Sequence, residues 1–381
     1  MQRGIHCGLA QYMLVSITDP VRETIIFGIL LCTVFLLTYR TKKHFSSFAY
    51  TQELKGFAIL TIVFAHIGYY LASDTRYLFP LSILAGVGVN LFFFLSGYGL
   101  SLSQLKKNER PLHFYARRLR KLFVPLWIVL SAFVFLDAVL LHKTYGLFYI
   151  VKAYLGIFTS ADLYTDINAP FWYFTLILIY YLLFPLLFNG KRLWLTALLF
   201  FLAIFALVKI NLPFLYGVIG LYRVHMYAFP LGIFAAYIVS AYPKLLLSVR
   251  AMYRRYSTFI FLPLMLALAA GIAYFAIHSN VGGPAYLEED TSLFTMLLLL
   301  LFFLVKKRES KLFSLFGLYS YEIYLFHWPL MYRYDVLFAH LPAGIANALY
   351  FGVFLLLARG LQEVTDRIIE RMRHTPKKSP Q

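Results

Sequence analysis

Several ionisable side chains of this sequence lie within long apolar stretches, where charged groups are rare. They are His66, Asp137, Glu322 and His327, with Arg223 and His225 near the end of a further stretch. A stretch of about 20 apolar residues is long enough to cross a bilayer. Because an ionisable group is costly in lipid, each of these side chains is a candidate for function.

His66 is the strongest candidate for acid–base chemistry. It follows Lys55 by eleven residues, which at about 1.5 Å per residue places it roughly 16 Å deeper than that lysine, near the middle of a bilayer. Desolvation there disfavours the cation of an unpaired imidazole, and an uncharged imidazole can serve as a general base. The alternative is a core histidine bonded to a neighbouring carbonyl or hydroxyl group.

A second polar segment occurs late in the chain. Its polar side chains are Ser320, Tyr321, Glu322, Tyr324 and His327. They are too many for a helix that faces lipid, so we expect them to line a polar cavity. The alternative is a satisfied network of hydrogen bonds between helices. Asp137, near the outer end of its own stretch, is expected to reach water.

Two further segments carry chemistry of a different kind. Arg117, Arg118, Arg120 and Lys121 crowd the start of one apolar stretch. They either contact anionic lipid or bind phosphate, which a guanidinium group holds through two hydrogen bonds. Separately, Ser96, Gly97 and Gly99 are small residues in an aromatic-rich segment. They favour close helix packing over room for a ligand.

The elements that position these residues follow from composition. The chain has 381 residues, of which only 14% are charged, against about 25% in typical soluble chains. Its apolar stretches predict an all-α, polytopic transmembrane bundle of about eleven helices. The expected spans are 22–39, 55–72, 81–100, 120–141, 170–188, 193–209, 224–241, 258–277, 292–305, 313–332 and 343–361. An amphipathic stretch over 146–159 predicts a helix at the membrane interface.

The basic residues indicate the orientation in the membrane. The formal net charge of +18 would suggest nucleic acid in a soluble protein, but here the charges fall between apolar stretches. Of the 35 lysines and arginines, 27 lie in alternate connections that include Arg40, Lys106 and Lys311, and eight lie in the others. The positive-inside rule places the larger set in the cytoplasm. We therefore expect an outer N-terminus and a cytoplasmic C-terminus.

No linker or change in composition divides the chain into soluble domains. We expect an extra transmembrane helix and basic loop over 1–50, a membrane domain over 51–361 and a basic cytoplasmic tail over 362–381. The first span is followed by Arg40, Lys42 and Lys43 rather than a cleavage site of small residues, so we interpret it as a retained helix. Cys7 and Cys32 predict neither a disulfide framework nor a metal site.

The ordered motifs resemble the acyltransferase-3 family of bacterial membrane acyltransferases over about residues 51–361. The similarity rests on Lys55 and His66, which keep the family's spacing of basic residue and histidine, and on four later motifs. These are Phe93 to Gly97, Arg118-Leu119-Arg120 with Pro125, Phe171-Trp172-Tyr173-Phe174, and Ser320-Tyr321-Glu322-Ile323-Tyr324-Leu325-Phe326-His327. Lys55 departs from the family, which has arginine there. A lysine can hold a phosphate, but not through a planar fork.

The resemblance implies a core of ten helices, preceded here by one extra helix. It also implies transfer of an acetyl or other short acyl group from acyl-CoA to a hydroxyl of a sugar, a cell-surface glycan or a lipid-linked glycan. We expect this in the bacterial inner membrane, without metal or nucleic acid, and with membrane lipid as a partner. The implied catalytic residues are His66 and Glu322. The implied donor-binding residues are Lys55, Arg118 and Arg120, and the implied acceptor-binding residues are Trp172, Tyr321, Tyr324 and His327.

Another class of protein would use the same buried residues. A transporter of a glycan or small anion could couple to protons through intramembrane His and Glu side chains. Inverted repeats would favour that interpretation, and none is evident in the sequence. A sensor or scaffold without catalytic activity is a further alternative, for which Lys55 would be the first indication.

Overall fold

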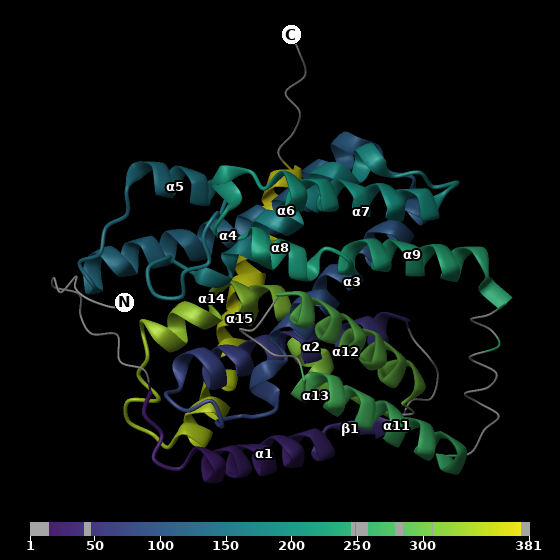
Figure 1. Ribbon diagram of the computed structural model, residues 1–381. Coiled ribbons are helices and arrows are strands. Elements are labelled where there is room, and N and C mark those ends of the chain that lie inside the picture. Colours follow the sequence, from purple (N-terminus) through teal and green to yellow (C-terminus); the bar gives the residue numbers. More distant parts are fainter. Residues whose placement is uncertain are drawn as a thin grey trace.

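The computed structural model describes residues 15–41, 47–244, 248, 258–278, 285–306 and 308–374. Within these ranges the chain forms a bundle of helices, with α1 along one edge and α5 and α7 at the opposite edge (Figure 1). The helices are α1 Pro20–Leu37, α2 Ser47–Ala65, α3 Ala85–Lys107, α4 Pro111–Leu140, α5 Leu147–Tyr154, α6 Trp172–Leu187, α7 Leu193–Ile210, α8 Ile219–His225, α9 Ala228–Ala241, α11 Thr258–Ile277, α12 Ala285–Val305, α13 Lys311–Leu318, α14 Ser320–Tyr332 and α15 Ala343–His374.

The predicted polytopic helical bundle is confirmed. Among the described residues, eight helices are long and apolar enough to cross a membrane. They are Pro20–Leu37, Phe48–Leu71, Ala85–Lys107, Pro111–Leu140, Ala169–Leu187, Leu193–Ile210, Ile219–Ala241 and Ala343–Met372. The chain is therefore a multi-pass membrane protein.

Three further spans were expected. The first, 258–277, coincides with α11, Thr258–Ile277, which is apolar along its length. In the second, α12 begins before the expected start and carries Glu288, Glu289 and Asp290 in its first turns. In the third, the span expected over 313–332 is two helices that meet at Tyr319. Ser310 caps the first of these, α13, by accepting a hydrogen bond from the Phe313 amide.

Glycines let pairs of helices approach closely. A Cβ built at Gly97 of α3 would lie 2.3 Å from the Phe229 carbonyl oxygen of α9, and one at Gly232 of α9 would lie 2.0 Å from the Phe94 carbonyl oxygen. Gly99 has nothing within 4 Å of such an atom. The expected packing use of this small-residue segment is thus confirmed at Gly97, whereas Gly99 faces open space.

Close approach at glycines also joins α2 to α13. A Cβ at Gly56 would lie 1.8 Å from the Phe313 carbonyl oxygen, and one at Gly317 would lie 1.9 Å from the Gln52 carbonyl oxygen. Two short strands, β1 Tyr39–Thr41 and β2 Arg308–Ser310, pair antiparallel beside this contact. The segment that follows α1 is therefore tied to the segment that precedes α13.

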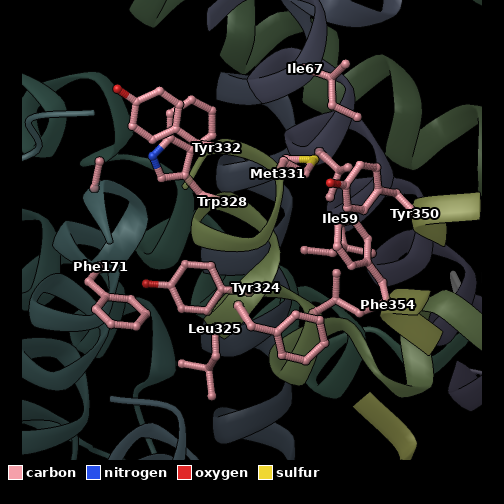
Figure 2. Packing of buried hydrophobic residues seen from close by; sticks show 14 of the residues in the cluster. Ile59, Ile67, Phe171, Tyr324, Leu325, Trp328, Met331, Tyr332, Tyr350 and Phe354 are labelled. Carbon is pink, nitrogen blue, oxygen red and sulfur yellow. The ribbon is translucent and has the colours of Figure 1, made fainter. Parts of the chain in front are cut away.

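Buried aromatic and aliphatic side chains surround α14 (Figure 2). Trp328 stacks on Tyr332 at 5.2 Å between ring centroids, and Tyr324 packs against Phe171 at 6.1 Å. Nearly every residue of this helix is buried. Such dense packing fixes the rotation of α14 about its own axis, and so the direction of its polar side chains.

Asp137 does not reach water as expected. It is fully buried and forms an ion pair with Arg333, with 2.7 Å between Nη1 and Oδ2. The hydroxyls of Tyr145 and Tyr334 also donate to its carboxylate. A buried carboxylate needs such partners, and Arg333 at the end of α14 is too distant in sequence to be assigned from the motif. Cys7, Lys42 and Lys43 lie outside the described residues.

Candidate active site

A cavity of about 270 Å³ lies between α2, α3, α6, α8, α12 and α14. The side chains that bring polar atoms to its wall come from all six helices and from the turn that extends α2. They are Lys55, His66, Tyr70, Ser96, Trp172, Tyr173, Tyr181, His225, Glu288, Ser320, Tyr321 and Tyr324. Of the site residues predicted from the sequence, Lys55, His66, Trp172, Tyr321 and Tyr324 line this cavity.

His66 lies where α2 changes its helical geometry. The helix continues beyond Ala65 as a π-helix, His66–Leu71. Such turns are rare and often occur at functional sites. The His66 ring lies 5.8 Å from the Tyr70 ring and 5.3 Å from the Trp328 ring, centroid to centroid. Because the side chain is only partly buried, the ring retains access to the cavity.

His327 lies directly behind His66. Its Nε2 is 3.1 Å from His66 Nδ1. Its Nδ1 is 3.1 Å from the Ile323 carbonyl oxygen and 3.0 Å from the Tyr324 carbonyl oxygen. The side chain is fully buried, and it does not line the cavity. His327 was predicted to contact the acceptor, but in the structure it contacts His66.

The hydrogen bonds of His327 determine the tautomers of both rings. A carbonyl oxygen only accepts, so His327 Nδ1 carries the proton. In the uncharged ring His327 Nε2 then accepts, and His66 Nδ1 donates to it. His66 is left with a lone pair on Nε2, the nitrogen that can take a proton from a bound molecule. A histidine oriented by a second group in this manner is the arrangement used in general-base catalysis.

Tyr321 and Tyr324 of the late motif line the cavity and also connect α14 to neighbouring segments. Tyr321 donates its hydroxyl to the Leu122 carbonyl at 2.6 Å, and Tyr324 donates to the Pro170 carbonyl at 2.9 Å. These bonds join α14 to α4 and to the turn before α6. Both hydroxyls keep lone pairs, so each can still accept a hydrogen bond from a ligand.

Glu322 lies away from His66. It does not line the cavity, and its electrostatic partners are Lys55, Lys121 and Asp366. The predicted pair of His66 and Glu322 is thus not brought together. Because Glu322 and His327 are five residues apart on one helix, they project in different directions. Glu322 is therefore placed in the field of Lys55 and Lys121 and not at the wall of the cavity that His66 lines.

Lys55 and Arg118 form a positive region at one end of the cavity. Lys55 lines the cavity and interacts electrostatically with Arg118 and Lys121. Arg118 does not itself line the cavity, and its guanidinium lies 6.0 Å from the centre of the Phe114 ring. Its Nε is buried without a hydrogen-bond partner among the described residues. A guanidinium with an unused donor beside a lysine is suited to bind an anion.

The neighbouring arginines are already engaged. Arg120 donates from Nε to the Ala116 carbonyl at 2.8 Å, within its own helix. Arg117 forms an ion pair with Glu109, and this hydrogen-bonded contact lowers the pKa of the Glu109 carboxyl below its usual value. Of these three arginines, Arg118 is the one whose Nε has no hydrogen-bond partner among the described residues.

The structure also adds residues that the motifs did not include. His225, Glu288, Tyr70 and Tyr181 line the cavity. The His225 ring is stacked on Trp172, 5.5 Å away at an angle of 14°. Its position in an apolar stretch was the signal available in the sequence, but its partner Asn90 lies in another helix, 135 positions earlier.

A family model described as an acyltransferase domain matches residues 48–359, which is most of the chain. The chain belongs to the acyltransferase-3 family. It is therefore a membrane acyltransferase. No curated protein and no solved structure matches it.

The matched range begins in α2, so α1 of this acyltransferase lies ahead of it. Four of the five motifs that carried the resemblance contribute lining residues to one cavity, and the motif of Arg118 and Arg120 does not. Ser96 of the α3 motif, Trp172 of the α6 motif and Tyr324 of the α14 motif all line it beside His66. Residues far apart in sequence thus form one site, as expected for a catalytic centre built between helices.

Proposed function

We propose that this acyltransferase moves an acetyl or other short acyl group from acyl-CoA to a hydroxyl of a sugar or of a surface or lipid-linked glycan. The observation that supports the proposal is the contact of His327 Nε2 with His66 Nδ1, which leaves the Nε2 lone pair to a histidine that lines the cavity. We further propose that the chain resides in the bacterial inner membrane, with its N-terminus outside and its C-terminus in the cytoplasm. Lys55 and Arg118 then lie toward the cytoplasm, where acyl-CoA is found.

The proposed reaction proceeds in two steps. The acceptor hydroxyl oxygen attacks the thioester carbonyl carbon while His66 Nε2 takes the hydroxyl proton. The tetrahedral intermediate then collapses, the C–S bond breaks, and the thiolate receives the proton from His66. His327 stabilises the transient imidazolium by accepting from its Nδ1–H. Lys55 and Arg118 hold the phosphates of coenzyme A, because both side chains are cationic and donate hydrogen bonds to phosphate oxygens.

The test uses purified protein in nanodiscs with radiolabelled acetyl-CoA and a panel of soluble glycosides. We expect label to move to an acceptor and coenzyme A to be released in equal amount. Coenzyme A release without an acylated product would leave only hydrolysis. Neither release nor product with any acceptor would contradict the proposal.

A further inference from the structure

His225 is the second histidine of the cavity, and the proposed reaction does not use it. It ends α8, is 4% exposed and stacks on Trp172. It lines the same cavity as His66. Its ring is held by a chain of hydrogen bonds whose direction can be worked out from one end.

The chain starts at the Glu289 carbonyl, which can only accept. Ser292 donates its hydroxyl to that carbonyl at 3.2 Å, and Asn90 Nδ2 donates to Ser292 Oγ at 3.0 Å. Asn90 therefore presents Oδ1 to His225 Nδ1, 2.8 Å away, and accepts a hydrogen from it. In the uncharged ring His225 Nε2 is then a hydrogen-bond acceptor. Asn90 and Ser292 are themselves 1% and 2% exposed, so water does not compete for these bonds.

Glu288 shares the small space in front of this ring. A Cβ built at Gly86 would lie 3.5 Å from Glu288 Oε1 and 3.8 Å from His225 Cε1. Glu288 also interacts with Tyr70, one turn beyond His66. Arg223, on the same helix as His225, pairs instead with Glu289 at 3.5 Å. This end of the cavity therefore carries a carboxyl group and a histidine acceptor.

The two ends of the cavity differ in charge. Lys55 and Tyr70 both line it and are fifteen residues apart along α2 and its π-helical extension. At about 1.5 Å per residue, the cationic end and the Glu288 end are separated by roughly 20 Å along that axis. His66 lies between them. An anion is favoured at the Lys55 end and disfavoured at the Glu288 end.

We propose that His225 and Glu288 bind the acceptor and select ligands that donate hydrogen bonds and carry no negative charge. The proposal rests on the proposed function, because it takes His66 as the point of reaction between the two ends. His225 is a positioning residue: its Nε2 accepts from one hydroxyl while the neighbouring hydroxyl reaches His66. An acceptor with adjacent hydroxyls offers one hydroxyl to each histidine.

The experiment measures binding in the absence of acyl-CoA, so it does not depend on turnover. Purified protein in nanodiscs is titrated at pH 8 with methyl glucopyranoside and with methyl glucuronide. The two ligands have the same sugar ring, but only the glucuronide carries a carboxylate. We expect the neutral glycoside to bind at least about tenfold more tightly. In Glu288→Gln the difference should fall to less than about threefold, because the repulsion is removed.

The variants at His225 separate hydrogen bonding from packing. We expect His225→Leu to weaken methyl glucopyranoside binding about tenfold, a typical cost for a lost hydrogen bond in a buried site. His225→Gln, which can place an acceptor near the Nε2 position, should remain within about threefold of wild type. His340→Leu changes an exposed histidine and serves as the control.

Equal binding of the two glycosides to the wild type, no binding of either, or unchanged binding by His225→Leu would overturn the assignment. A large loss of kcat with unchanged acceptor KM in His225→Leu would overturn it too, since His225 would then act in the chemistry. Acetyl-CoA affinity is measured on the same samples. Its absence in the wild type would contradict the proposed function, whatever the glycosides do.

Discussion

At the scale of single residues, the hydrogen bond between His66 and His327 decides which nitrogen can accept a proton. The direction of that bond follows from the two carbonyl oxygens at His327 Nδ1. Without His327 the His66 ring could rotate or adopt the other tautomer, and its lone pair would leave the cavity. We therefore expect His327 to matter for catalysis although it is fully buried behind the ring.

Replacing His327 tests this relay. We expect His327→Leu to lower kcat by about 10²-fold or more, within the range attributed to general-base catalysis, and to leave the KM for acetyl-CoA within about twofold. The measurement is steady-state coenzyme A release with a saturating acceptor. His327→Gln, whose amide can bond to His66, should recover part of the loss. A kcat close to wild type in His327→Leu would remove the relay from the mechanism.

The arginines of α4 differ in their availability for a ligand. Among the described residues Arg118 Nε has no hydrogen-bond partner, whereas Arg120 Nε bonds to Ala116 and Arg117 to Glu109. We expect Arg118→Ala to raise the KM for acetyl-CoA about 10- to 100-fold, the range for a hydrogen bond to a charged group. Arg120→Ala should change it by less than about threefold. Equal effects of the two substitutions would show that the whole cluster acts only as a field of positive charge.

At the scale of helices, the close contact between α3 and α9 positions Ser96 and the end of α8. Gly97→Ala should destabilise the protein by about 1–3 kcal/mol, because the added methyl group meets the Phe229 backbone and forces the helices apart. Gly99→Ala is the matched control on the same helix, where the Cβ meets open space. Thermal unfolding in detergent compares them. Similar melting temperatures for the two variants would contradict the packing argument.

The sequence predicted elements well where a signal is local. Most long apolar stretches are single helices, as the sequence predicted. The break at Tyr319 was not predicted, because α13 and α14 together read as one apolar stretch. The contact at Gly317 that accompanies this break depends on Gln52 in another helix.

Hydrogen bonds between residues far apart along the chain could not be predicted from the sequence either. His66 and His327 were both identified as candidates, but their hydrogen bond spans 261 positions. The structure places His327, and not Glu322, against His66. Which of two residues on a helix faces a given neighbour depends on the rotation of that helix. Asn90 and His225 are a further pair of this kind.

At the scale of the whole molecule, the distribution of charge predicts an orientation in the membrane that remains to be measured. The positive-inside rule predicts that the loop containing Thr75 faces outward and that the loop containing Lys107 faces the cytoplasm. Both side chains are exposed. In a background with Cys7 and Cys32 replaced by serine, a membrane-impermeant maleimide should label Thr75→Cys in intact cells. It should label Lys107→Cys only after lysis. The reverse pattern would invert the assigned direction of donor entry.

Acetyl transfer by His66→Ala tests directly whether His66 is the general base. We expect kcat to fall by at least about 10²- to 10⁴-fold, while the variant inserts, melts like wild type and binds acetyl-CoA with unchanged affinity. His340→Ala, at an exposed position, should retain full activity. Transfer by His66→Ala at the wild-type rate would contradict the assignment of His66 as the base.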